Sequence, residues 1–200
     1  MAMPKSQEAL DLARRAGVVR PRDLVAHGIP RVYLSRLARR GQLERVGRGL
    51  YALPDAEVSE NRMLAEASKR APCGVVCLLS ALRFHGLTTQ NPYQVWLAIG
   101  HKAWAPKIDG PPLRIVRMSG PAMEDGVETH RVDGVLVRVY APAKTVADCF
   151  KFRNKTGLDV ALEALRDYRR AHPAGMDELW YYARICRVSR VIRPYVEAVG

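Results

Sequence analysis

Helical and hairpin patterns follow one another through the first fifty residues of the chain. The spacing of apolar residues predicts helices over residues 6–16, 21–27 and 30–40. A glycine follows each of these segments, and prolines can open the second and third. Between the first two helices, Val18-Val19 is long enough only for a linker or a bridge. Two apolar runs, 43–46 and 50–53, flank Gly47-Arg48-Gly49, which predicts a β-hairpin with glycines at its turn. Helices followed by a hairpin in this order are typical of a winged helix-turn-helix.

The third of these helices has two different faces. At 100° per residue, Leu34 and Leu37 define the buried direction. The opposite face carries Arg31, Val32, Ser35, Arg36 and Arg39. Arginine can bond guanine through two hydrogen bonds, serine can bond a base edge or a phosphate, and valine can contact a thymine methyl group. We therefore expect these five side chains to read base pairs in the major groove of DNA.

Positive charge is concentrated in the same segment. The chain carries 32 Lys and Arg against 20 Asp and Glu, a formal net charge of +12. Residues 1–53 hold 11 of the basic and 4 of the acidic side chains, which is more than half of the excess in about a quarter of the chain. Such a surface attracts polyanions, so nucleic acid is the expected partner, with phosphates held by Arg22, Arg45 and Arg48. An ordinary solvated face is the alternative, but no acidic residue lies between Asp23 and Glu44 to balance the arginines.

The remaining residues predict a second domain that begins after Pro54-Asp55. Periodic apolar segments predict helices over residues 59–70, 75–84, 142–153, 158–170, 176–187 and 189–199, and strands over residues 94–99, 113–118, 127–131 and 135–140. Asp133-Gly134 is a strong hairpin turn between the last two strands. The predicted fold class is α+β: a winged helix-turn-helix DNA-binding domain in residues 1–54, then a mixed α+β domain in residues 55–200 with a small, mainly antiparallel sheet and C-terminal helices.

Catalytic and metal-binding patterns are missing from the sequence. Cys73 and Cys77 are four residues apart, but no other Cys or His pair nearby has metal-ligand spacing, and no apolar leader is visible. We expect Cys73, Cys77, Cys149 and Cys186 to be small buried thiols in a reducing cytoplasm, with a metal site as the alternative. The chain has no Gly-Ser, Gly-Lys or His-Glu pair, nor an acidic residue two positions before a lysine, which disfavours nucleotidyltransferases, phosphate-loop enzymes, zinc proteases and common nucleases. We therefore expect no catalysis, metal or cofactor. The longest apolar run, 75–82, is too short to span a membrane.

Four residues of the second domain could still be drawn into a catalytic group, namely His85, Lys144, Thr145 and Asp148. Each has a simpler interpretation. His85 stands at a helix end, as a cation there or a buried hydrogen-bond donor. Thr145 lies in the first turn of a helix. Asp148 can pair with Lys144 four residues earlier or with Lys151 three residues later.

Several segments resemble AbiEi-type antitoxins, the regulator halves of type IV toxin–antitoxin (abortive infection) systems. In the N-terminal domain the resemblance rests on GVVRPRDL (17–24), GIPRVYLSRL (28–37) and GQLERVGRGLY (41–51). In the second domain it rests on SALRFHGLTTQ (80–90), VWLAI (95–99), PAKTVADCFKFR (142–153) and GLDVALEAL (157–165). The resemblance implies a repressor of its own toxin–antitoxin operon that opposes a nucleotidyltransferase-like toxin in phage defence.

Two partners follow from this interpretation. The first is double-stranded operator DNA with inverted repeats, because a single helix-turn-helix usually needs a second copy to bind tightly. The second is the cognate toxin, whose direct contact stays open. A basic cluster formed by Lys144, Lys151, Arg153 and Lys155 is the candidate antitoxic surface, and a solvated helix end is its alternative. Other readings are an antitoxin that acts mainly by occluding its toxin, with DNA binding secondary, and a DNA-processing enzyme with a winged-helix specificity domain.

Overall fold

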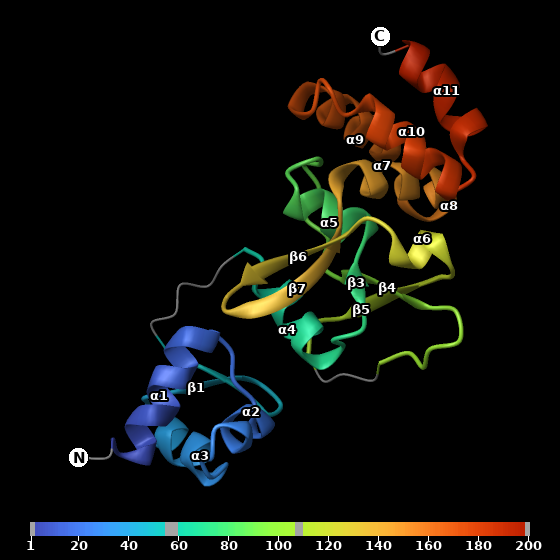
Figure 1. Cartoon of the computed structure of the whole chain (residues 1–200). Helices are drawn as coiled ribbons and strands as arrows, with labels where there is room; N and C mark the ends of the chain where they lie inside the picture. Colours follow the sequence, from blue (N-terminus) through green and yellow to red (C-terminus); the bar gives the residue numbers. More distant parts are fainter. Residues whose placement is uncertain (1–2, 55–59, 107–109, 199–200) are drawn as a thin grey trace. The chain divides into compact units, whose positions relative to one another are not determined.

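The computed structural model describes residues 3–54, 60–106 and 110–198 (Figure 1). The chain divides into two compact units. The first comprises Met1–Arg70, Lys107–Pro111 and Arg131–Val137, and the second comprises Ala71–Pro106, Pro112–His130 and Arg138–Gly200. The helix before Arg70 therefore clusters with the N-terminal unit. A domain boundary between residues 54 and 55 stays a prediction.

The first unit has the element order of a winged helix-turn-helix. Its elements are α1 (Lys5–Ala16), α2 (Pro21–Ala26), α3 (Val32–Arg39), β1 (Glu44–Gly47), β2 (Leu50–Ala52) and α4 (Arg62–Arg70). Strands β1 and β2 form the predicted antiparallel hairpin. Val19 forms an isolated antiparallel bridge with Tyr51, so the bridge interpretation of Val18-Val19 is confirmed. The expected helix start at Ser59 lies outside the described residues, and the helix α4 begins at Arg62.

The apolar core of this unit fixes which face of α3 turns outward. Leu34 and Leu37 are each about 1% exposed and belong to a cluster with apolar side chains of the two preceding helices and of the segments between the elements. The buried members are Ala9, Leu10, Leu12, Ala13, Val19, Leu24, Ile29, Leu34, Leu37 and Leu43. Because α3 uses its leucines to join this cluster, its arginine-bearing side faces solvent.

Besides the β1–β2 hairpin, the described residues form a larger sheet of five strands in the order β5-β4-β3-β7-β6. They are β3 (Val75–Val76), β4 (Val95–Gly100), β5 (Leu113–Met118), β6 (Val127–Val132) and β7 (Val135–Tyr140). Strand β3 runs antiparallel to β4 but parallel to β7, and β4 runs parallel to β5 over six residue pairs. The expectation of a mainly antiparallel sheet is therefore wrong, because β5 follows β4 in the same direction through a crossover. The sheet is mixed.

One predicted helix of the second unit is also wrong in part. Residues 75–84 were expected to be a single helix, but Val75 and Val76 form β3 and pair with Ala98 and Leu97. The helix α5 covers only Leu78–Phe84. Two β-branched residues favour a strand, and pairing with β4 provides partners for their backbone groups.

Helices α7, α9, α10 and α11 gather at the C-terminal end of the second unit (Figure 1). The helices of this unit besides α5 are α6 (Pro121–Glu124), α7 (Pro142–Lys151), α8 (Arg153–Thr156), α9 (Leu158–Ala171), α10 (Met176–Ile185) and α11 (Ser189–Ala198). Helix α7 is central, because every residue from Ala143 to Phe150 is buried and α5, α9 and α10 pack against it. Within the described segments, no helix is both long and apolar enough to cross a membrane.

Candidate nucleic-acid interface

Helix α3 presents the predicted reading residues on one exposed face. Its five predicted contact residues Arg31, Val32, Ser35, Arg36 and Arg39 are all exposed, with Arg31 at the N-cap position. Val32 keeps 44% of its surface in solvent, so its methyl groups are accessible to a partner. The face therefore offers three guanidinium groups, a hydroxyl and a methyl-bearing side chain together.

The polar groups of this face have few competing partners. Within the described part of the chain, none of Arg31, Arg36 and Arg39 forms an ion pair. The guanidinium of Arg36 lies 5.7 Å from the centre of the Tyr33 ring, a cation–π contact that orients it without neutralising it. The Ser35 hydroxyl donates to the carbonyl of Val32 at 3.0 Å, which leaves its oxygen able to accept. These charges remain available to an anionic partner.

The remaining predicted contacts come from α2 and the hairpin. Arg22, Arg45 and Arg48 are all exposed. The Arg45 side chain donates to the carbonyl of Gly47 at 3.3 Å, across the irregular register of the hairpin. All eight residues that the sequence indicated for DNA binding thus lie on the surface of the first unit, on three of its elements.

Sequence reasoning missed the residues that hold α2 in place. The backbone N–H of Arg20 donates to the Asp23 carboxylate at 2.9 Å, and Lys69 of α4 approaches the same carboxylate to 2.9 Å. Burial opposes ionisation of Asp23, but these bonds outweigh it and lower the pKa of the carboxyl group. An acidic side chain three residues after the N-cap was a readable capping signal. The contribution of Lys69 had no signal in the sequence.

One residue of the candidate antitoxic surface, Lys144, is buried in the structure. Lys144 has no exposed surface, and its Nζ lies 2.5 Å from Asp148 Oδ2 and 4.1 Å from the centre of the Tyr140 ring. The prediction that Lys144 belongs to a basic surface is therefore wrong, because helix α7 is buried over its whole middle and the lysine points into the core. Of the two partners open to Asp148, the structure selects Lys144.

The other three basic residues of that cluster remain near the surface. Lys151 and Lys155 are exposed, and both ammonium groups lie within about 6 Å of the Phe152 ring, at 6.0 Å and 5.5 Å. Arg153 is half-buried and donates to the carbonyl of Phe150 at 2.9 Å. These three side chains stand at the end of α7 and on α8.

Several polar groups of the second unit are buried and hydrogen-bonded to one another or to the backbone. Cys77, Cys149 and Cys186 are buried but Cys73 is exposed, so the expectation of four buried thiols is wrong for Cys73. The Cys186 thiol donates to Asp148 Oδ1 at 3.1 Å, and burial raises the pKa of that thiol to about 12 and raises the pKa of Asp148. His85 donates from Nε2 to the carbonyl of Tyr140 at 2.8 Å, so of its two interpretations the hydrogen-bond donor is the one realised. Among the residues that the structure describes, no three His, Cys, Asp or Glu side chains could jointly hold a metal ion.

Comparison with known proteins bears mainly on the N-terminal unit. Residues 7–54 match the model of a family described as "Transcriptional regulator, AbiEi antitoxin", which confirms the resemblance there and supports an antitoxin with a regulatory role. No match is found among curated proteins. The crystal structure of the RV2827C protein from Mycobacterium tuberculosis is similar, with a TM-score of 0.58 and 16% identity over 99% of this chain and 81% of that chain. That likeness shows a shared fold alone.

Proposed function

We propose that this chain is a sequence-specific DNA-binding antitoxin that represses its own toxin–antitoxin operon and opposes a nucleotidyltransferase-like toxin. The observation that carries the proposal is the exposed face of α3, where three unpaired arginines stand in a segment that matches AbiEi regulators. Family membership of that segment supports both a DNA partner and a toxin partner. The domain boundaries 1–54 and 55–200 and a cytoplasmic location belong to the same proposal.

DNA recognition then divides between two groups of side chains. Arg31, Ser35, Arg36 and Arg39 read base edges in the major groove, and Val32 contacts a thymine methyl group. Arg22, Arg45 and Arg48 hold phosphates from α2 and the hairpin. Release of counterions from the phosphates supplies most of the affinity, and the base contacts supply the sequence preference. Two copies bind the two halves of an inverted repeat, without metal or cofactor.

Footprinting of the purified chain on the DNA upstream of its own coding sequence tests this proposal. We expect two protected half-sites in inverted orientation, with centres separated by a multiple of about 10 base pairs, because each recognition helix must meet the same face of the duplex. A scrambled duplex of the same composition is the control. Equal binding to both duplexes would contradict a sequence-specific repressor.

The antitoxic activity is proposed to use the basic residues at the end of α7 and on α8. Replacing Lys151 and Arg153 by glutamate reverses two charges near Phe152 and should weaken neutralisation of the toxin about tenfold or more, as measured by growth rescue at graded antitoxin expression. The matched control reverses Arg166 and Arg170, two exposed arginines on α9. Full neutralisation by the Lys151/Arg153 variant would remove this surface from the proposal.

The proposed mode of action is binding and not catalysis. The buried thiols of Cys149 and Cys186 have pKa values raised by burial, so they stay protonated and unreactive at neutral pH. Asp148, the residue most easily drawn as a catalytic acid, is enclosed by Lys144 and Cys186. Mg²⁺- or Mn²⁺-dependent hydrolysis or nucleotidyl transfer by the purified chain, abolished by Asp148→Asn, would contradict this part of the proposal.

A further inference from the structure

The C-terminal end of α4 is bonded to two of the three predicted DNA-contacting parts of the first unit, α2 and the hairpin. Lys69 Nζ donates to the carbonyl of Val18 at 2.7 Å and lies 2.9 Å from Asp23 Oδ2 at the start of α2. Its neighbour Arg70 donates from Nη2 to the carbonyl of Arg48 at 3.1 Å, in the turn of the hairpin. Two adjacent residues of one helix therefore reach α2 and the hairpin at the same time.

The contact with α2 is a closed network. Arg20, the N-cap residue of α2, donates from Nη1 to the carbonyl of Lys69 and contacts both Asp23 carboxylate oxygens through its backbone and side chain. The Lys69 and Asp23 side chains are only 12% and 21% exposed. Hydrogen bonds between charged, partly buried groups are the strong kind, because little water competes with them. The network fixes the first turn of α2, next to the predicted phosphate contact Arg22.

The contact with the hairpin is equally close. A Cβ atom at Gly47 would lie 2.8 Å from Arg70 Nη2, so the end of the Arg70 side chain lies against the backbone of β1. The Nε atom of Arg70 is buried without a hydrogen-bond partner among the described residues. Burying a donor unpaired is unfavourable. The other contacts of this guanidinium must therefore hold it in place.

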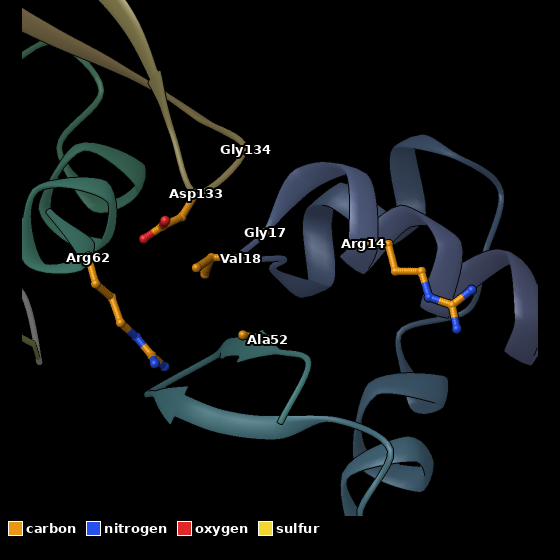
Figure 2. A pocket seen from close by; sticks show the side chains of 7 residues that line it. All are labelled: Arg14, Gly17, Val18, Ala52, Arg62, Asp133 and Gly134. Atoms are coloured by element: carbon orange, nitrogen blue, oxygen red, sulfur yellow. The ribbon is translucent and has the colours of Figure 1, made fainter. Parts of the chain in front are cut away.

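The opposite end of α4 also belongs to this unit. Arg62 shares with Gly17, Val18 and Ala52 the lining of a hollow of about 200 Å³. In Figure 2 the Arg62 side chain extends toward Ala52 of β2, while Arg14 points away from the other labelled side chains. Side chains at both ends of α4 therefore contact or face residues of the first unit.

We propose that Lys69 and Arg70 are positioning residues for DNA recognition, which fix α2 and the hairpin relative to each other so that both engage one duplex. The inference rests on the proposed DNA-binding function and goes beyond it, because α4 lies outside the matched residues 7–54. Arg22 and Arg48 hold phosphates from elements that are separate in sequence. Contacts from separate elements add up only when the elements are held in the productive geometry before binding.

The first test compares two lysine variants of the full chain. Lys69→Met removes the ammonium but keeps the apolar stem, and Lys5→Met removes the same charge from an exposed ion pair with Glu8 on α1. We expect Lys69→Met to weaken operator binding about tenfold, as one displaced base contact does. Lys5→Met should change it less than about twofold, since an exposed charge is screened by salt. Lys69→Arg, which keeps a donor and a charge, should restore most of the affinity. Anisotropy titrations with operator and random duplexes measure all four proteins.

The second test separates positioning from electrostatics by the sign of the effect. Asp23→Asn removes a negative charge from the DNA-facing unit, so electrostatics alone predicts tighter binding. Loss of the bond to Lys69 predicts weaker binding instead. Asp11→Asn, which removes an equivalent charge from α1, is the control and should bind slightly tighter. Tighter binding by both variants would overturn the positioning role.

Amide hydrogen exchange without DNA gives an independent readout. Lys69→Met should lower the protection of Leu24 in α2, whereas Lys5→Met should leave it unchanged. Equal operator affinities of Lys69→Met and Lys5→Met would overturn this inference alone. A wild-type chain that does not prefer its operator would overturn the proposed function together with it.

Discussion

The Lys144→Met variant is expected to lose about 3–5 kcal/mol of the free energy of unfolding near neutral pH, the largest effect among the substitutions considered. Lys144 and Asp148 have no exposed surface, and their charged atoms are 2.5 Å apart. Removing the ammonium leaves a carboxylate in the apolar core, where the Cys186 thiol is its one remaining side-chain donor among the described residues. Urea unfolding followed by circular dichroism measures the loss.

Two further variants show whether the loss comes from the unpaired charge. Lys144→Met/Asp148→Leu replaces both ions by apolar side chains of similar size and should recover most of the stability, because a buried ion pair contributes little over an apolar pair. Lys151→Met alters an exposed lysine of the same helix and should change stability by less than about 0.5 kcal/mol. A double variant as unstable as the single one would contradict this explanation.

The same explanation predicts how the stability of Lys144→Met changes with pH. Burial raises the pKa of Asp148 above its ordinary range, although Lys144 and Cys186 oppose that rise. Without Lys144 the pKa rises further. A raised pKa in the folded state means that the folded protein favours the protonated carboxyl group. The loss of unfolding free energy in Lys144→Met is therefore small below pH ~4, where Asp148 is protonated in both the folded and unfolded states. This loss grows as the pH rises through the new pKa. Unfolding measured from acid to neutral pH follows this growth.

Local patterns explain why the N-terminal unit could be predicted well. The leucines of α3 recur at helical spacing, and glycines end the segments, so the order of helices and hairpin was readable from neighbouring residues. The same spacing placed Arg31, Arg36 and Arg39 on the outer face, where the structure has them. Features that depend on residues within one turn of helix are encoded locally.

Features that depend on contacts between residues far apart in the chain could not be predicted from the sequence. The parallel pairing of β4 with β5 is decided by a crossover, and Val75-Val76 becomes a strand only because β4 lies beside it. The bond from Lys69 to Val18 joins residues 51 positions apart. Lys144 lies in the core although lysine is rarely buried, because a carboxylate one helical turn away makes its burial tolerable.

The Arg36→Ala variant is expected to bind its operator about 5- to 150-fold more weakly, which corresponds to about 1–3 kcal/mol, and to lose base preference at one position. Arg36 is exposed in the middle of the outer face of α3, and the Tyr33 ring orients its guanidinium. A fork of donors held in this way can bond the O6 and N7 atoms of a guanine. Competition binding with operators altered one base pair at a time measures the preference.

Variants of two other arginines, Arg48 and Arg40, test whether Arg36 reads a base rather than binding a phosphate. Arg48→Ala removes a predicted phosphate contact, so it should weaken all duplexes alike and reduce the slope of log affinity against log salt by about one. Arg40→Ala removes an exposed arginine at the C-cap of α3, outside the predicted face, and should leave base preference unchanged. Equal losses for operator and random DNA in Arg36→Ala would place Arg36 with the phosphate contacts. Base reading would then fall to Arg31, Ser35 and Arg39, the remaining polar side chains of the face.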